Sequence, residues 1–102
     1  MTAMREAVAH LKERAAGIAS LRQFQRDCES ALRQAHDEAA FLRLLADLTG
    51  RFVDRYDDQP LEVAAAKAAY DRLVRFAERA LAAERAEDKL KLLNELGSAD
   101  LG

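Results

Sequence analysis

Residues 20–56 read SLRQFQRDCESALRQAHDEAAFLRLLADLTGRFVDRY and contain one helix breaker, Gly50. Most of the other residues are Leu, Ala, Arg, Gln, Asp or Glu, and β-branched residues are scarce, which favours helix over strand. Apolar residues recur at the spacing of one helix face: Leu21, Phe24, Cys28, Leu32, Ala35, Ala39, Leu42, Leu45, Leu48, Phe52 and Tyr56. We therefore predict one long helix over residues 20–56, in which Gly50 costs about 1 kcal/mol relative to Ala.

An amphipathic helix is predicted before this stretch, with its apolar face at Met4, Ala7, Val8, Leu11, Ala15 and Ile18. The same spacing then reaches polar residues, so we predict a break at residues 17–20. Gly17 suits the C-terminus of the first helix, and Ser20 with Gln23 forms a capping box for the second. The alternative is one continuous helix with a local shift of phase.

A second break is predicted at Asp57-Asp58-Gln59-Pro60, because Pro60 disfavours a helical Gln59 and fits the first turn of the next helix. Asp58 or Gln59 would be the cap. The third helix is rich in alanine, and its predicted buried face is Val63, Ala66, Tyr70, Val74, Ala77 and Leu81. The apolar phase changes after Ala83, so this helix either breaks around Ala86–Asp88 or turns its last part to another partner.

The sequence thus predicts an all-α protein with a single helical domain over residues 1–97 and a flexible tail over residues 98–102. Its centre is a long helical hairpin, residues 20–56 against residues 60–86, with a helix at each end. The complete structure is either a three- or four-helix bundle or a dimeric bundle with coiled-coil-like contacts. Because Ala dominates the apolar residues and Trp is absent, we favour the dimer.

Charge and composition exclude several classes of function. The net charge is −2, and no run of five like charges suggests a nucleic-acid-binding arm. No apolar run is long enough to cross a membrane, and residues 1–11 lack the apolar core of a signal peptide. We therefore expect a cytoplasmic protein with neither nucleic acid nor membrane as partner.

The usual reactive residues are sparse. Cys28 is in phase with the apolar face, so we expect a buried, inert thiol. His10 and His36 lie far apart on polar faces, and neither has a Glu three residues before it. We predict no metal site, no cofactor and no catalytic residue, and an enzyme is less expected than a binding protein.

Arginines are the most distinctive polar residues, with twelve against four lysines. Arg72, Arg75 and Arg79 share one face of the third helix and are candidates for anion binding, because a guanidinium binds carboxylates and phosphates through two hydrogen bonds. The alternative is a solvated face of ion pairs such as Asp71–Arg75. Glu38 and Glu84 fall on apolar arcs and are either buried acids or salt-bridge partners at the edge.

The segment from Lys89 to Leu96 is rich in leucine and out of phase with the helix before it. Leu90, Leu93 and Leu96 are candidates for binding a protein partner, unless the segment folds back on its own core. We therefore expect a helical protein–protein interaction module, such as an adaptor, assembly factor or chaperone-like subunit. The alternative is a small-molecule-binding protein or enzyme with an Arg/Glu-lined site between helices.

Overall fold

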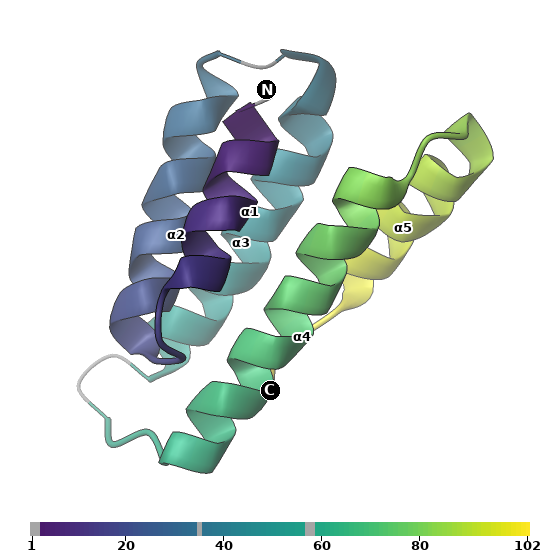
Figure 1. Cartoon of the computed structure of the whole chain (residues 1–102). Helices are drawn as coiled ribbons and strands as arrows, with labels where there is room; N and C mark the ends of the chain where they lie inside the picture. The colour runs from purple at the N-terminus through teal and green to yellow at the C-terminus, as the bar shows by residue number, and fades with distance from the viewer. Residues whose placement is uncertain (1–2, 35, 57–58) are drawn as a thin grey trace.

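The computed structural model describes residues 3–34, 36–56 and 59–102, apart from the side chain of His36 (Figure 1). In these ranges the chain forms five α-helices and one short 3-10 helix, with no strand, so the prediction of an all-α protein is confirmed. The elements are α1 (Ala3–Glu13), α2 (Ile18–Leu32), η1 (His36–Glu38), α3 (Ala39–Arg55), α4 (Val63–Ala82) and α5 (Ala86–Ser98).

The predicted continuous helix over residues 20–56 is wrong, because the chain reverses between α2 and α3. The two helices lie side by side as an antiparallel hairpin (Figure 1). The N–H of Arg33 donates to the carbonyl of Ser30 at 3.2 Å and that of Gln34 to Ala31 at 2.9 Å. These three-residue hydrogen bonds tighten and end α2. The hairpin predicted between residues 20–56 and 60–86 is therefore replaced by a shorter one, α2 against α3.

The predicted break between the first two helices is confirmed, but its details differ. Helix α1 already ends at Glu13, and Gly17 lies at the N-cap of α2 with an extended backbone, φ 175°. Ser20 does not cap α2 as a capping box requires: its hydroxyl donates to the carbonyl of Ala15 at 2.5 Å. The connection is thus fixed by a side chain that reaches back from the first turn of α2.

The remaining helix ends shift by a few residues from their predicted places. Gly50 lies inside α3, as predicted. Helix α4 begins at Val63, with Glu62 rather than Gln59 at the N-cap, so the predicted start at Pro60 is wrong. Asp57 and the alternative cap Asp58 lie outside the described residues. The break between α4 and α5 precedes Ala86, slightly earlier than predicted.

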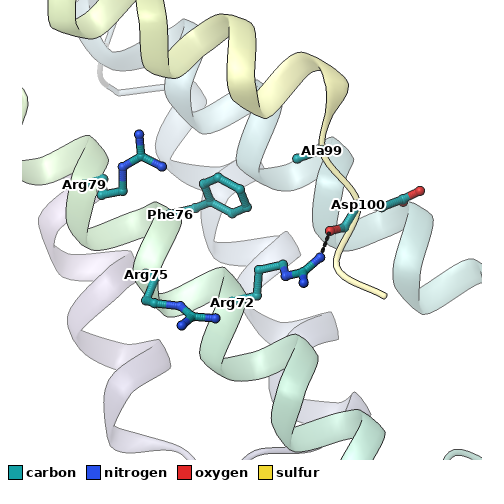
Figure 2. A pocket seen from close by; sticks show the side chains of 6 residues that line it. All are labelled: Arg72, Arg75, Phe76, Arg79, Ala99 and Asp100. Atoms are coloured by element: carbon teal, nitrogen blue, oxygen red, sulfur yellow. Dashed lines mark hydrogen bonds between the residues drawn. The ribbon is translucent and has the colours of Figure 1, made fainter.

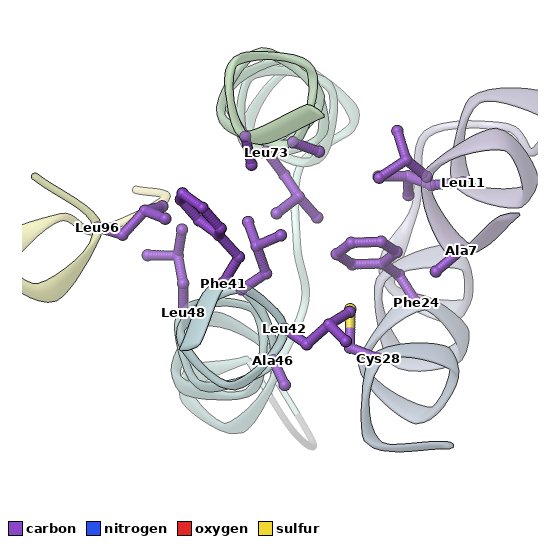
Figure 3. Packing of buried hydrophobic residues seen from close by; sticks show 14 of the residues in the cluster. Ala7, Leu11, Phe24, Cys28, Phe41, Leu42, Ala46, Leu48, Leu73 and Leu96 are labelled. Carbon is purple, nitrogen blue, oxygen red and sulfur yellow. The ribbon is translucent and has the colours of Figure 1, made fainter. Parts of the chain in front are cut away.

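All five helices contribute to one apolar core (Figure 3). Leu11 comes from α1, Phe24 and Cys28 from α2, Leu73 from α4 and Leu96 from α5, and each is fully buried. Helix α3 supplies the largest group of buried residues: Phe41, Leu42, Leu45, Ala46, Leu48, Thr49, Gly50, Phe52 and Val53. The buried position of Cys28 confirms its predicted place in the core.

The buried side chains of α4 are smaller than those predicted. It consists of Ala66, Ala69, Leu73, Ala77 and Ala80. Val63 is 85% exposed, which corrects its predicted burial, and Tyr70, Val74 and Leu81 lie at the edge. Tyr70 remains at the edge because its hydroxyl donates to the carbonyls of Leu11 at 2.8 Å and Arg14 at 3.1 Å, at the end of α1.

The core is closed within a single chain. The radius of gyration is 12.9 Å, close to the value of about 13 Å for a compact chain of this length. A second copy is therefore not needed to cover the apolar faces of the hairpin. This weakens the energetic reason for a dimer, and the homodimer remains a prediction.

The reversal between α2 and α3 is tested by electron–electron double resonance on spin labels at Arg26→Cys and Asp54→Cys in a Cys28→Ala background. Both positions border one surface hollow between the two helices, so we expect a distance of about 20 Å or less, given helix axes about 8–10 Å apart. A continuous helix would separate these positions by about 42 Å at 1.5 Å per residue. A distance near that value would refute the hairpin.

Candidate functional site

The three predicted arginines of the third helix line one cavity. Arg72, Arg75 and Arg79 follow one another on the outer face of α4, with Phe76 between them, because residues three and four apart share a helix face. Ala99 and Asp100, which follow α5, form the opposite side of the cavity (Figure 2). The cavity has a volume of about 340 Å³. This hollow, which we call the arginine cavity, therefore lies on the surface between α4 and the chain that follows α5.

Arg79 connects α4 to α5. Its guanidinium pairs with the carboxylate of Glu95 at 2.5 Å and lies 5.9 Å from the centre of the Phe76 ring. The two charged side chains are 51% and 39% exposed, so water screens the pair and its contribution is about 1 kcal/mol or less. Phe76 is half-buried and provides the apolar part of the cavity wall. Arg79 thus already has a structural role.

Residues 99–102, which we call the C-terminal segment, accept hydrogen bonds from three arginines: Arg72 of α4, and Arg51 and Arg55 of α3. The guanidinium of Arg72 donates to the carbonyl of Asp100 at 3.0 Å (Figure 2). From α3, Arg51 donates to the carbonyl of Ala99 at 3.2 Å. Residues 98–102, expected to be a flexible tail, thus include a segment that contacts two helices, and the side chain of Leu101 is only 3% exposed.

Arg75 differs from its two neighbours on α4. It is exposed, and within the described part of the chain it forms no ion pair or hydrogen bond. The predicted pair with Asp71 is not formed, because Asp71 pairs instead with Lys67 at 3.0 Å. The guanidinium of Arg75 is therefore available to an anion from outside, without breaking a contact inside the protein.

The leucines predicted to bind a partner do not share an exposed face. Leu90 is 61% exposed, Leu93 is half-buried and Leu96 is fully buried. Leu92, which was not singled out, is also buried. Helix α5 therefore folds back and closes the core through Leu92 and Leu96, and of the three candidates only Leu90 is well exposed.

Neither of the two singled-out glutamates borders the arginine cavity. Glu84 is exposed. Glu38 is half-buried just before α3, and its Oε1 atom is buried without a hydrogen-bond partner among the residues that the structure describes. The carboxyl residue of the cavity is Asp100 instead. The structure therefore does not bring Glu38 or Glu84 together with the three arginines of α4.

The thiol and the charged residues elsewhere offer little reactive chemistry. Burial raises the pKa of Cys28 far above its ordinary value, and the neighbouring carboxylates of Asp27 and Glu29 add to the effect. His10 is exposed on α1. Among the described residues, no three His, Cys, Asp or Glu side chains gather closely enough to hold a metal ion.

Comparison of the chain with models of protein families, with curated proteins and with solved structures finds no match. None of the helices in the described ranges is both long and apolar enough to cross a membrane. The chemistry of the site therefore has to be inferred from its residues. Those that line the arginine cavity can bind an anion and an apolar group, but they include no nucleophile and no histidine.

Sequence reasoning missed Arg51, Arg55, Phe76 and Leu101 at this site. Phe76 lies within the arginine stripe and could have been found by extending the same helical spacing. The other three meet the site only through the folding of residues 99–102 onto α3. The one local signal was a leucine, Leu101, in a segment otherwise made of small and acidic residues.

The burial of Cys28 predicts two measurable properties. A thiol reagent such as dithionitrobenzoate should label the folded protein at least about a hundredfold more slowly than the denatured protein, because access requires opening of the core. Since the folded state raises the thiol pKa, the unfolded state loses this proton first as the pH rises. The free energy of unfolding should therefore fall as the pH passes the ordinary thiol pKa of about 8.5. The variant Cys28→Ala is the control: it should lack this part of the pH dependence, and rapid labelling of the folded protein would contradict the buried position.

Proposed function

We propose that the protein is a helical interaction module that binds a carboxylate-rich segment of a partner protein at the arginine cavity. The observation that carries this proposal is the position of Arg75 beside the half-buried ring of Phe76: its guanidinium is exposed and has no partner in the described ranges of the chain. A carboxylate would gain a charge-assisted hydrogen bond from Arg75, and an adjacent apolar side chain would cover Phe76. In this role the protein would act as an adaptor or assembly factor.

The exposure of the cavity favours a chain segment over an enclosed ligand. Arg72, Arg75 and Arg79 are all exposed, whereas small-molecule sites bury about 70–90% of their ligand. Exposed ion pairs contribute about 0.2–1 kcal/mol each, so the affinity of a single acidic segment should be modest and should weaken with salt. Such binding suits reversible assembly.

A small anionic molecule is the second candidate ligand. The volume of about 340 Å³ falls at the lower end of the range of about 300–1,000 Å³ that small-molecule pockets occupy. Guanidinium groups and an aromatic ring would then hold a carboxylate or phosphate on an apolar body. Thermal unfolding in the presence of such compounds separates the two candidates, because a ligand that binds the folded state raises the melting temperature.

Charge reversal at Arg75 tests the proposed function. We expect Arg75→Glu to weaken binding of a labelled peptide of four glutamates around one leucine at least tenfold at low salt, measured by fluorescence polarisation. Arg33→Glu is the matched control, because Arg33 is exposed just after α2 and does not border the cavity. The control has the same net charge as Arg75→Glu, so an equal loss of binding in both variants would mean that only overall charge matters, and the proposal would fail.

Self-association is proposed as a secondary property. The large apolar side chains that are well exposed in the described part of the chain are Val63 and Leu90, on different helices. A dimer would have to bury such residues together with the exposed alanines of α4. Native mass spectrometry at low micromolar concentration should show twice the chain mass of 11.3 kDa if the homodimer forms, and a single-chain mass would reject it.

A further inference from the structure

We propose that the C-terminal segment is an internal ligand of the surface formed by Arg51, Arg55 and Arg72. A partner segment with an acidic residue followed by leucine and a small residue takes its place. This inference rests on the proposed function, since it names the kind of partner and the regulation of the same site. Asp100 and Ala99 border the arginine cavity, so the segment and an incoming partner would meet the same side chains.

The backbone of the segment is held by arginine side chains rather than by secondary structure. Arg51 and Arg72 donate to the carbonyls of Ala99 and Asp100, at 3.2 and 3.0 Å, and Arg55 donates to the carbonyl of Gly102. Three arginines from α3 and α4 thus donate to the main-chain carbonyls of three of the four residues in the segment. Any peptide with the same backbone conformation presents the same carbonyls, so this part of the recognition does not depend on sequence.

Side chains of the segment supply the specificity. The carboxylate of Asp100 lies 3.6 Å from the guanidinium of Arg55, and the side chain of Leu101 is only 3% exposed within the apolar core. A Cβ added to Gly102 would lie 3.3 Å from the ring of Phe52, so a small residue fits best after the leucine. The surface therefore selects the order acidic, leucine, small.

Release of the segment would cost little compared with unfolding of a helix. Its described hydrogen bonds come mainly from exposed arginine side chains, and Leu101 is its one large apolar anchor. Release would also free the guanidinium of Arg72 and widen the arginine cavity. Because the segment is tethered, its effective concentration is on the order of millimolar, and a partner must compete against that.

The proposal is tested with two variants that weaken the segment and with two probes. Leu101→Ser removes the apolar anchor, and Asp100→Lys reverses the charge of a residue whose side chain is 55% exposed, so the second variant should leave the core intact. The probes are the acidic peptide used above and a peptide of residues 97–102, both titrated into ¹⁵N-labelled protein by NMR. Circular dichroism verifies that each variant is folded.

We expect both variants to bind both peptides at least about tenfold more tightly than the unchanged protein, with shifts at Phe52 and Arg72. Equal affinity of the unchanged protein and the variants for the peptide of residues 97–102 would overturn the internal-ligand proposal. If that peptide binds the variants more tightly while the acidic peptide binds none of the proteins, the internal ligand is supported and the proposed function fails. A concentration-dependent exchange of the segment between two copies would also overturn the proposal.

Discussion

The packing of α2 against α3 is the interaction on which the rest of the structure depends. Of the eleven largest fully buried side chains, seven belong to these two helices: Leu21, Phe24, Cys28, Leu42, Leu45, Leu48 and Thr49. Burial of a leucine or phenylalanine side chain contributes about 1.5–3 kcal/mol, and burial of an alanine far less. In a chain whose commonest apolar residue is alanine, the hairpin therefore supplies most of the stabilising apolar area, and the other helices are added to it.

The hairpin also determines which side chains α4 can place toward the core. Its inward face consists mainly of small residues, because α1, α3 and α5 all pack against α4. Alanines at positions such as Ala69 and Ala77 let the backbone of α4 lie close to the core. The large and charged residues of α4 then project outward, which places the arginine stripe and Phe76 on the surface. The candidate site thus exists because α4 buries mainly alanines and keeps its larger and charged side chains at the surface.

The sequence predicted the helices and most of their breaks, and it predicted that Arg72, Arg75 and Arg79 lie together. These features depend on spacing within one helix, which a sequence displays directly. The reversal after α2 was missed because Leu32 and Ala39 are seven residues apart, close to two helical turns, so the apolar repeat continues across the turn unchanged. The available signal was the stretch from Arg33 to Glu38, which is polar apart from Ala35, since the acidic residues at its end favour the start of a new helix. The contacts of Leu101 could not be predicted, because they depend on the position in the folded protein at which α5 ends.

The arginines of the cavity divide into two kinds, and this division limits how the site can work. Arg72 and Arg79 each hold another part of the chain, the C-terminal segment and α5, so an anion that engages them competes with an existing contact. Arg75 forms no hydrogen bond or ion pair within the described residues. An acidic partner would therefore meet Arg75 first, at no internal cost, and would gain Arg72 only by displacing the carbonyl of Asp100. Recognition in two steps follows from this arrangement: a weak contact that any carboxylate can make, and a tighter one that requires a segment able to replace residues 99–102.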